Sequence, residues 1–237
     1  MYSIDSYVFI NNNSKNTILF LHGWGCNKDY FLSIANKITF SNSLIIDLPG
    51  FGKNKELNIV FSLHDFVDSI LLFLKTKRYS PCIIVGHSFG GKLAVFLADK
   101  IKIKFLILLS PSIINKRRHI NYYFKILLYK AIKKSKILKK ISSKMGSEDY
   151  KVLPPIMKKT MSNVINTKCI KEYSKLNLPI LLIFGKSDKT TPIYLGKKLN
   201  KSNKFSSLII LEGEHFFYFQ NEATIINIIE VMVENYD

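Results

Sequence analysis

The chain contains few cysteines and arginines and no long apolar run. Its three cysteines among 237 residues are odd in number and irregular in spacing, which argues against a disulfide framework. No apolar run approaches the roughly 20 residues that a membrane-spanning helix needs. The first ten residues also lack the basic and apolar regions of a signal peptide. We therefore expect a cytoplasmic globular protein.

Patterns typical of metal and phosphate sites are missing as well. The histidines and cysteines do not cluster at the spacings of metal ligands. The glycines do not form a phosphate-binding loop. We therefore expect the protein to act without a metal or a cofactor.

Short apolar runs alternate along the chain with amphipathic segments, and 47% of the residues are hydrophobic. This alternation is typical of an α/β fold, in which helices cover both faces of a mostly parallel sheet. We expect about seven strands. The predicted strands are 7–10, 17–21, 43–47, 82–86, 104–109, 179–184 and 207–211, and the predicted helices are 29–38, 63–76, 90–100, 192–200 and 217–233.

The motif Gly86-His87-Ser88-Phe89-Gly90 lies between a predicted strand and a predicted helix. A serine at such a tight strand-to-helix turn, a nucleophile elbow, is presented at the carboxyl edge of the sheet. The two glycines suit the turn because a Cβ at either position would collide across it. Ser88 is therefore the predicted nucleophile, and it requires a nearby base to accept its proton.

With this motif the chain resembles the α/β-hydrolase superfamily, and the resemblance covers nearly its whole length. The turn 47–52 matches the pattern D-x-P-G-x-G, and it and the segment around Trp24 are similar to small bacterial esterases such as pimeloyl-carrier-protein methyl ester esterases. The other matching segments are the oxyanion loop within 19–25, the acid loop at 184–188 with Pro192, and the histidine loop at 213–216.

The resemblance implies a catalytic triad of Ser88, Asp188 and His215, in the chain order of this fold. His215 would act as the base, and Asp188 would orient its imidazole. Some relatives carry the acid after strand 104–109, where this chain has no carboxylate, and this favours Asp188. Three structural alternatives remain at this stage: a serine that merely tolerates the tight turn for Ser88, a helix N-cap for Asp188 and a surface-loop residue for His215. His22 is expected to brace the oxyanion loop.

The resemblance also implies an oxyanion hole formed by the backbone N–H groups of Trp24 and Phe89. The predicted substrate pocket is lined by Trp24, Phe89, Phe124 and Leu128. For Trp24, a place in the core is an equally good interpretation.

Basic residues are concentrated in one part of the chain, whose net charge is +18. Residues 111–175 carry 17 Lys or Arg against three acids, and the remainder carries 18 against 14. We predict that 111–176 is a basic helical cap inserted after the sixth strand of the family's sheet into a core of 1–110 and 177–237. Its lysines form a solvated face, contact an anionic membrane surface peripherally, or bind an acidic carrier protein. Nucleic acid is not expected, because no recognition motif accompanies the charge.

These observations predict a serine hydrolase that cleaves a carboxylic ester or thioester through an acyl-enzyme intermediate. Two alternatives stay open. One is a carbon–carbon bond hydrolase or lyase with the same triad, and the other is a non-catalytic ligand-binding protein with this fold.

Overall fold

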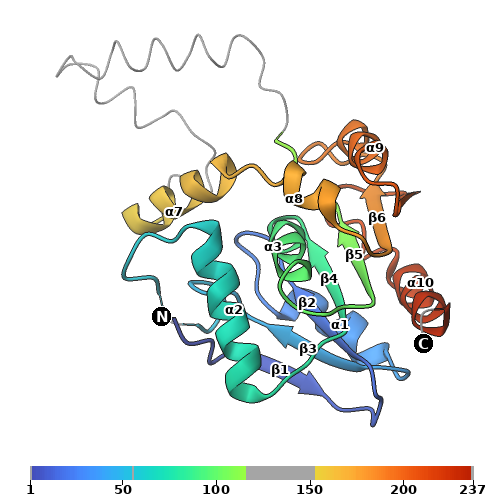
Figure 1. Cartoon of the computed structure of the whole chain (residues 1–237), viewed down its shortest axis with the longest axis horizontal. Coiled ribbons are helices and arrows are strands. Elements are labelled where there is room, and N and C mark those ends of the chain that lie inside the picture. Colours follow the sequence, from blue (N-terminus) through green and yellow to red (C-terminus); the bar gives the residue numbers. More distant parts are fainter. Residues whose placement is uncertain (1, 55, 116–152, 236–237) are drawn as a thin grey trace.

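The computed structural model describes residues 2–54, 56–115 and 153–235 (Figure 1). Seven strands form one sheet in the order β1-β3-β2-β4-β5-β6-β7. Only β1 is antiparallel to its neighbour, β3, and the other pairs are parallel. The strands are β1 (Tyr7–Ile10), β2 (Thr17–Leu21), β3 (Asn42–Ile46), β4 (Ile83–His87), β5 (Phe105–Leu109), β6 (Ile180–Gly185) and β7 (Ser206–Leu211).

The predicted α/β fold with a mostly parallel sheet is confirmed, and every strand lies within one residue of its predicted bounds. The five inner strands are buried on both faces, as their continuous apolar runs require, whereas the edge strands β1 and β7 are only partly buried. In β4, for example, Ile84 packs into one core cluster, while Ile83 and Val85 pack into the other. The described helices are α1 (Asp29–Lys37), α2 (Leu63–Lys77), α3 (Phe89–Ala98), α7 (Pro155–Asn166), α8 (Ile170–Lys175), α9 (Ile193–Ser202) and α10 (Glu222–Asn235).

The two hydrophobic clusters show which helices cover which face. Helices α1 and α10 contribute to the cluster on one face, whereas α2, α3, α7, α8 and α9 contribute to the cluster on the other. The carboxyl ends of the parallel strands meet at one edge of the sheet. The loops after β2, β3, β4, β6 and β7 therefore converge there.

The last helix begins later than predicted, at Glu222 and not at 217. Residues 216–221 form turns in which Phe217 and Tyr218 are buried while Phe216 and Phe219 are exposed. The spacing of these exposed and buried aromatic residues is the same as in one turn of a helix, which explains why the predicted helix begins too early. The side chain of Asn221 instead bonds the carbonyls of Glu212 and Phe217 and so secures the turns that follow β7.

Helices α7 and α8 lie between β5 and β6, inside the predicted insertion. They lie on the side of the sheet that α2 and α3 cover (Figure 1) and share the core cluster of those helices. The Thr160 hydroxyl of α7 accepts a hydrogen bond from the N–H of Phe61, just before α2, at 3.0 Å. The predicted pocket residues Phe124 and Leu128 lie outside the described residues. The division into core and cap therefore stays a prediction.

Within the part of the chain that the structure describes, no helix is long and apolar enough to cross a membrane.

Two glycines near the carboxyl edge differ in what an added methyl group would meet. A Cβ on Gly90 would lie 2.1 Å from the carbonyl oxygen of Leu21 in β2, whereas a Cβ on Gly25 would meet nothing within 4 Å. Gly25 has a φ of +76°, so alanine there brings only the cost of the left-handed conformation.

We expect Gly90→Ala to lower the free energy of unfolding by about 3 kcal/mol or more, because backbone atoms of β2 must move. Gly25→Ala should cost only about 1 kcal/mol. Urea denaturation of both variants measures the difference. Equal losses would show that α3 does not pack as closely on β2 as the structure indicates.

Candidate active site

Ser88 occupies a strained turn between β4 and α3, as the elbow motif predicts. Its φ of +50° and ψ of −108° are unusual for a residue with a side chain. The turn is held by the backbone, because the Ser88 N–H donates to the carbonyl of Leu109 at 2.9 Å and the Ser88 carbonyl accepts from Ser112 at 2.9 Å. The Ser88 side chain is therefore presented at the N-terminus of α3, where the helix dipole favours negative charge.

Asp188 and His215, which are 27 residues apart in sequence, meet at the same edge. The Nδ1 of His215 lies 2.8 Å from Oδ2 of Asp188. Because a carboxylate only accepts hydrogen bonds, Nδ1 carries the proton and Nε2 is left as the basic nitrogen. The Asp188 side chain is fully buried, and that of His215 is 16% exposed.

Asp188 is held as an anion by several donors. Its Oδ1 accepts from the N–H groups of Thr190 and Thr191 at 2.8 and 2.9 Å, and its Oδ2 accepts from the Thr191 hydroxyl at 2.7 Å. Burial alone would raise the pKa of Asp188, but the hydrogen bonds and charge of His215 and the bonds from Thr191 outweigh it and hold the pKa far below its usual range. The residue that precedes α9 as its cap is Pro192, so Asp188 stabilises the turn before the helix and is not its N-cap.

Thr191 is a site residue that the sequence analysis missed. Its hydroxyl lies between three groups: Asp188 Oδ2, the Ser110 carbonyl at 3.3 Å and His215 Nδ1 at 3.3 Å. A threonine three residues after the acid and directly before Pro192 was the available signal. Its contact with Ser110 depends on β5 lying beside β6, which the local sequence does not reveal.

His87 connects the Ser88 turn to the histidine loop. Its Nε2 lies 3.0 Å from the backbone carbonyl of His215, so Nε2 must carry the proton and donate it. Burial and the charge of His215 lower the pKa of His87 to about 3, so the ring stays neutral. The rings of His87 and His215 are 4.7 Å apart. The residue before Ser88 therefore sets the position of the His215 backbone.

The loop after β2 lies directly against Ser88. A Cβ built on Gly23 would be 3.5 Å from Cβ of Ser88 and 2.9 Å from Nδ1 of His87, so glycine is needed for this approach. The Trp24 ring packs edge-on against Phe89 and Phe51, with centroids 5.4 and 4.9 Å apart. Phe89 itself is 3% exposed. The two residues with the predicted oxyanion N–H groups are therefore neighbours beside Ser88.

His22 fastens this loop to the next strand, in line with the bracing role expected for it. Its Nε2 accepts a hydrogen bond from the Leu48 N–H at 2.9 Å, so Nδ1 holds the proton and donates to the Gly23 carbonyl at 2.7 Å. Burial lowers the pKa of His22 to about 4, which keeps this neutral tautomer in place.

Groups of three or more His, Cys, Asp or Glu that could hold a metal ion do not occur among the described residues. The chemistry that the arrangement offers follows from the side chains that meet at this edge. It combines a half-buried hydroxyl on a strained turn, an imidazole with a free basic nitrogen, and a buried carboxylate that orients that imidazole.

Comparison with known proteins agrees with this fold. The family model for the alpha/beta hydrolase fold matches residues 16–134, just over half of the chain. The chain therefore belongs to the α/β-hydrolase family.

Individual proteins that are similar to this chain include esterases. A Mycoplasma genitalium protein named as an inferred esterase/lipase is 28% identical over 219 residues, covering 82% of this chain and 81% of the relative. A pimeloyl-[acyl-carrier protein] methyl ester esterase from Neisseria meningitidis serogroup A is 22% identical and covers 82% and 69%. The solved structure of an esterase from Exiguobacterium antarcticum superposes with a TM-score of 0.75 at 16% identity and covers 98% of both chains, which shows the shared fold.

Replacing the Thr191 hydroxyl tests its part in the site. We expect Thr191→Val to lower kcat/KM for an ester by about tenfold, equal to about 1.4 kcal/mol, because Asp188 loses a donor and orients His215 less tightly. Thr190→Val is the matched control, since the Thr190 side chain is exposed and only its backbone N–H reaches Asp188. An equal loss in both variants would contradict a role for the Thr191 hydroxyl.

The lowered pKa of Asp188 predicts a pH-dependent contribution to stability. A depressed pKa means that the folded state favours the anion, so the contribution is present above the unfolded pKa of about 3.9 and is lost as the pH falls below it. We expect the free energy of unfolding of the wild type to exceed that of Asp188→Asn by at least about 1.4 kcal/mol at pH 5, and the difference to shrink toward pH 2.

Urea denaturation at pH steps between 5 and 2 measures this difference. Asp68→Asn is the matched control because Asp68 is exposed on α2. A difference between wild type and Asp188→Asn that stayed constant over this range would contradict the lowered pKa of Asp188 and the hydrogen bonds from His215 and Thr191 that cause it.

Proposed function

We propose that the protein is a serine hydrolase that cleaves a carboxylic ester or thioester through an acyl-enzyme intermediate. The observation that carries the proposal is the 2.8 Å bond between His215 Nδ1 and Asp188 Oδ2 beside the strained Ser88 turn. This bond leaves the other imidazole nitrogen free to accept a proton, which is what a serine nucleophile requires.

In the proposed reaction, Ser88 Oγ attacks the carbonyl carbon while His215 Nε2 takes the hydroxyl proton. The negative charge on the carbonyl oxygen is stabilised by the N–H groups of Trp24 and Phe89. The alcohol or thiol then leaves with the proton from His215, and Ser88 carries the acyl group. A water molecule, deprotonated by His215, attacks the acyl carbon, and the acid leaves as Ser88 regains its proton. Asp188 stays ionised and stabilises the imidazolium in both steps.

The substrate class is supported by the relatives. Esterase names occur among them, and one acts on a methyl ester carried by an acyl-carrier protein.

The 17 basic residues in 111–175 suit either an acidic carrier protein or an anionic membrane surface as a partner. Sedimentation with anionic and neutral vesicles at low salt separates these two partners, because a carrier-specific enzyme would remain in the supernatant with both.

The test of the proposal combines covalent labelling with turnover. A fluorophosphonate probe should label the wild type at one site and fail to label Ser88→Ala, because the probe reacts only with an activated serine. The wild type should also hydrolyse p-nitrophenyl esters, with a maximum at one chain length between acetate and palmitate. Asp188→Asn should lower kcat by about 10⁴-fold, the size of the effect of the same change in a serine protease.

Two results would change the conclusion. Labelling of Ser88 without ester turnover would move the assignment to thioesters or carbon–carbon bonds. The absence of labelling in a folded wild type would contradict the triad itself.

A further inference from the structure

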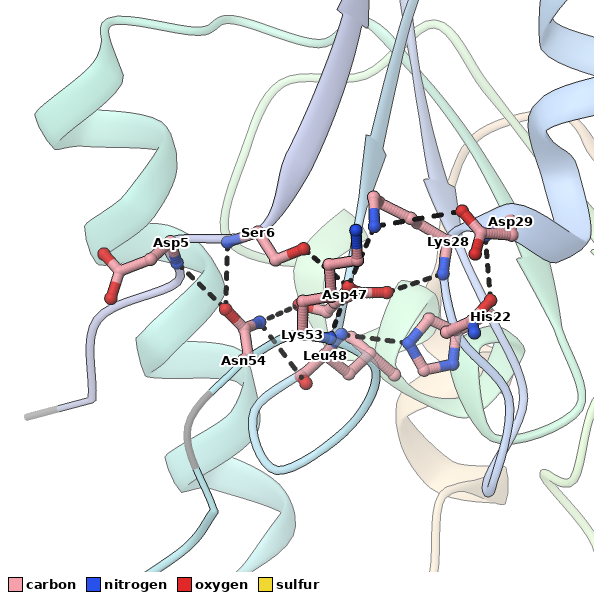
Figure 2. A network of polar contacts seen from close by, with 10 residues as sticks. Asp5, Ser6, His22, Lys28, Asp29, Asp47, Leu48, Lys53 and Asn54 are labelled. Carbon is pink, nitrogen blue, oxygen red and sulfur yellow. Dashed lines mark hydrogen bonds and ion pairs between the residues drawn. The ribbon is translucent and has the colours of Figure 1, made fainter.

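The carboxylate of Asp47, at the carboxyl end of β3, is completely buried and lies at the centre of a polar network (Figure 2). Oδ1 accepts from the backbone N–H of Lys28 at 2.7 Å. Oδ2 accepts from the Lys28 ammonium at 3.2 Å, the Ser6 hydroxyl at 2.6 Å and the Lys53 N–H at 3.0 Å. Burial alone would raise the pKa of Asp47, but these donors outweigh it and lower the pKa. Asp47 is therefore a buried anion.

The network fixes both ends of the loop that follows β2 through hydrogen bonds. At one end, His22 accepts from the N–H of Leu48, and at the other, Lys28 donates twice to Asp47 (Figure 2). Two consecutive residues after β3 thus fasten residues 22 and 28. Trp24 lies between them, and its ring also packs on Phe51 of the turn that follows Asp47.

Lys28 brings the only full positive charge that the described residues place on Asp47. Its side chain is 10% exposed, and the other ion-pair partner that the described residues offer it, Asp29, is 3.8 Å away and 57% exposed. A buried carboxylate is costly without a paired charge. Without the ammonium, Asp47 would keep its bonds from Ser6, the Lys53 N–H and the Lys28 N–H but lose its charged partner, so the carboxylate would shift or draw in water. Either change weakens its bond to the Lys28 N–H, which holds the far end of the loop.

We infer that Lys28 is a positioning residue for the oxyanion loop: its ion pair with Asp47 sets the place of the Trp24 N–H beside Ser88. The inference rests on the proposed function, because the oxyanion hole is part of that proposal. An oxyanion donor works only when it is already placed where the charge develops, so a small displacement of the loop lowers the rate. Ground-state binding of the ester is affected much less.

The decisive variant is Lys28→Met, which keeps an unbranched apolar side chain of similar length and removes the charge. We expect kcat for the best ester to fall by about tenfold while KM stays within about twofold. A trifluoromethyl ketone, which forms a tetrahedral oxyanion adduct on a nucleophilic serine, should bind about tenfold more weakly. A merely structural role for Lys28 would lower the melting temperature without changing this affinity below it.

Lys92→Met is the matched control. Lys92 is a second buried lysine, whose ammonium donates to the Val164 carbonyl of α7 at 2.8 Å, and among the described residues it forms no hydrogen bond or ion pair with the oxyanion loop. We expect this variant to keep the ketone affinity of the wild type. Equal weakening in both variants would overturn the inference, as would a folded Lys28→Met with kcat and ketone affinity within twofold of the wild type.

The single tryptophan of the chain provides a readout that does not depend on activity. Because Trp24 lies in the loop itself, acrylamide should quench its fluorescence more strongly in Lys28→Met than in the wild type, and no more strongly in Lys92→Met. Unchanged quenching in folded Lys28→Met would overturn the inference even if the protein were not an esterase. Conversely, failure of wild-type labelling together with increased quenching would reject the proposed function and retain the role of Lys28.

Ser6→Ala is the variant to test if Lys28→Met does not fold. Ser6 donates to the same oxygen of Asp47 as the Lys28 ammonium, but it lies outside the loop. Its loss should weaken ketone binding several-fold through the carboxylate alone. No change in ketone binding or in Trp24 quenching would overturn the inference.

Discussion

The strained turn at Ser88 is the constraint on which the rest of the site depends. A residue with φ near +50° and a side chain is held there only if its neighbours leave no alternative. The neighbours are β2 on one side of β4 and β5 on the other, which contact the turn through Gly90 and the Leu109 carbonyl. The central position of β4 in the sheet therefore allows the strain to persist, and that position follows from the packing of both faces.

Three histidines, His22, His87 and His215, lie around this turn. Burial lowers the pKa of His22 and of His87. His22 and His87 are kept neutral, and the hydrogen bonds that they make select opposite tautomers. His215 faces a carboxylate and is partly exposed. The low dielectric of the interior thus keeps two imidazoles as fixed hydrogen-bonding supports, and the third, His215, is the one to which the proposed reaction assigns proton transfer.

The two buried carboxylates of this edge have different surroundings. Asp188 is paired with an imidazole and two threonine residues, so its charge acts on the proposed base. Asp47 is paired with a lysine and with backbone N–H groups, so its charge acts on the loop beside Ser88. Both residues follow strands at the carboxyl edge, where the parallel sheet brings the loops after β3 and β6 to the same side.

Much of the fold could be predicted from local pattern. The apolar runs indicate all seven strands: the five inner strands are nearly all apolar because they are buried on both faces, and the partly exposed edge strands β1 and β7 are short apolar runs as well. The motif around Ser88 predicted the turn, and the loops after β6 and β7 supplied Asp188 and His215, which the structure brings to 2.8 Å. The start of α10 was misplaced, because the spacing of Phe216 to Phe219 imitates a helix while Asn221 binds the turns before it.

The sequence by itself determined the order of strands and helices and the identity of the proposed nucleophile, base and acid, because each of these is written in a few consecutive residues. Only the tertiary structure decided how these residues are supported. Thr191 contacts Ser110 across 81 residues, His87 contacts His215 across 128, and Lys28 contacts Asp47 across 19. Such contacts depend on which strands become neighbours. The order of the strands is set by the burial of the whole sheet, and the local sequence pattern does not reveal it.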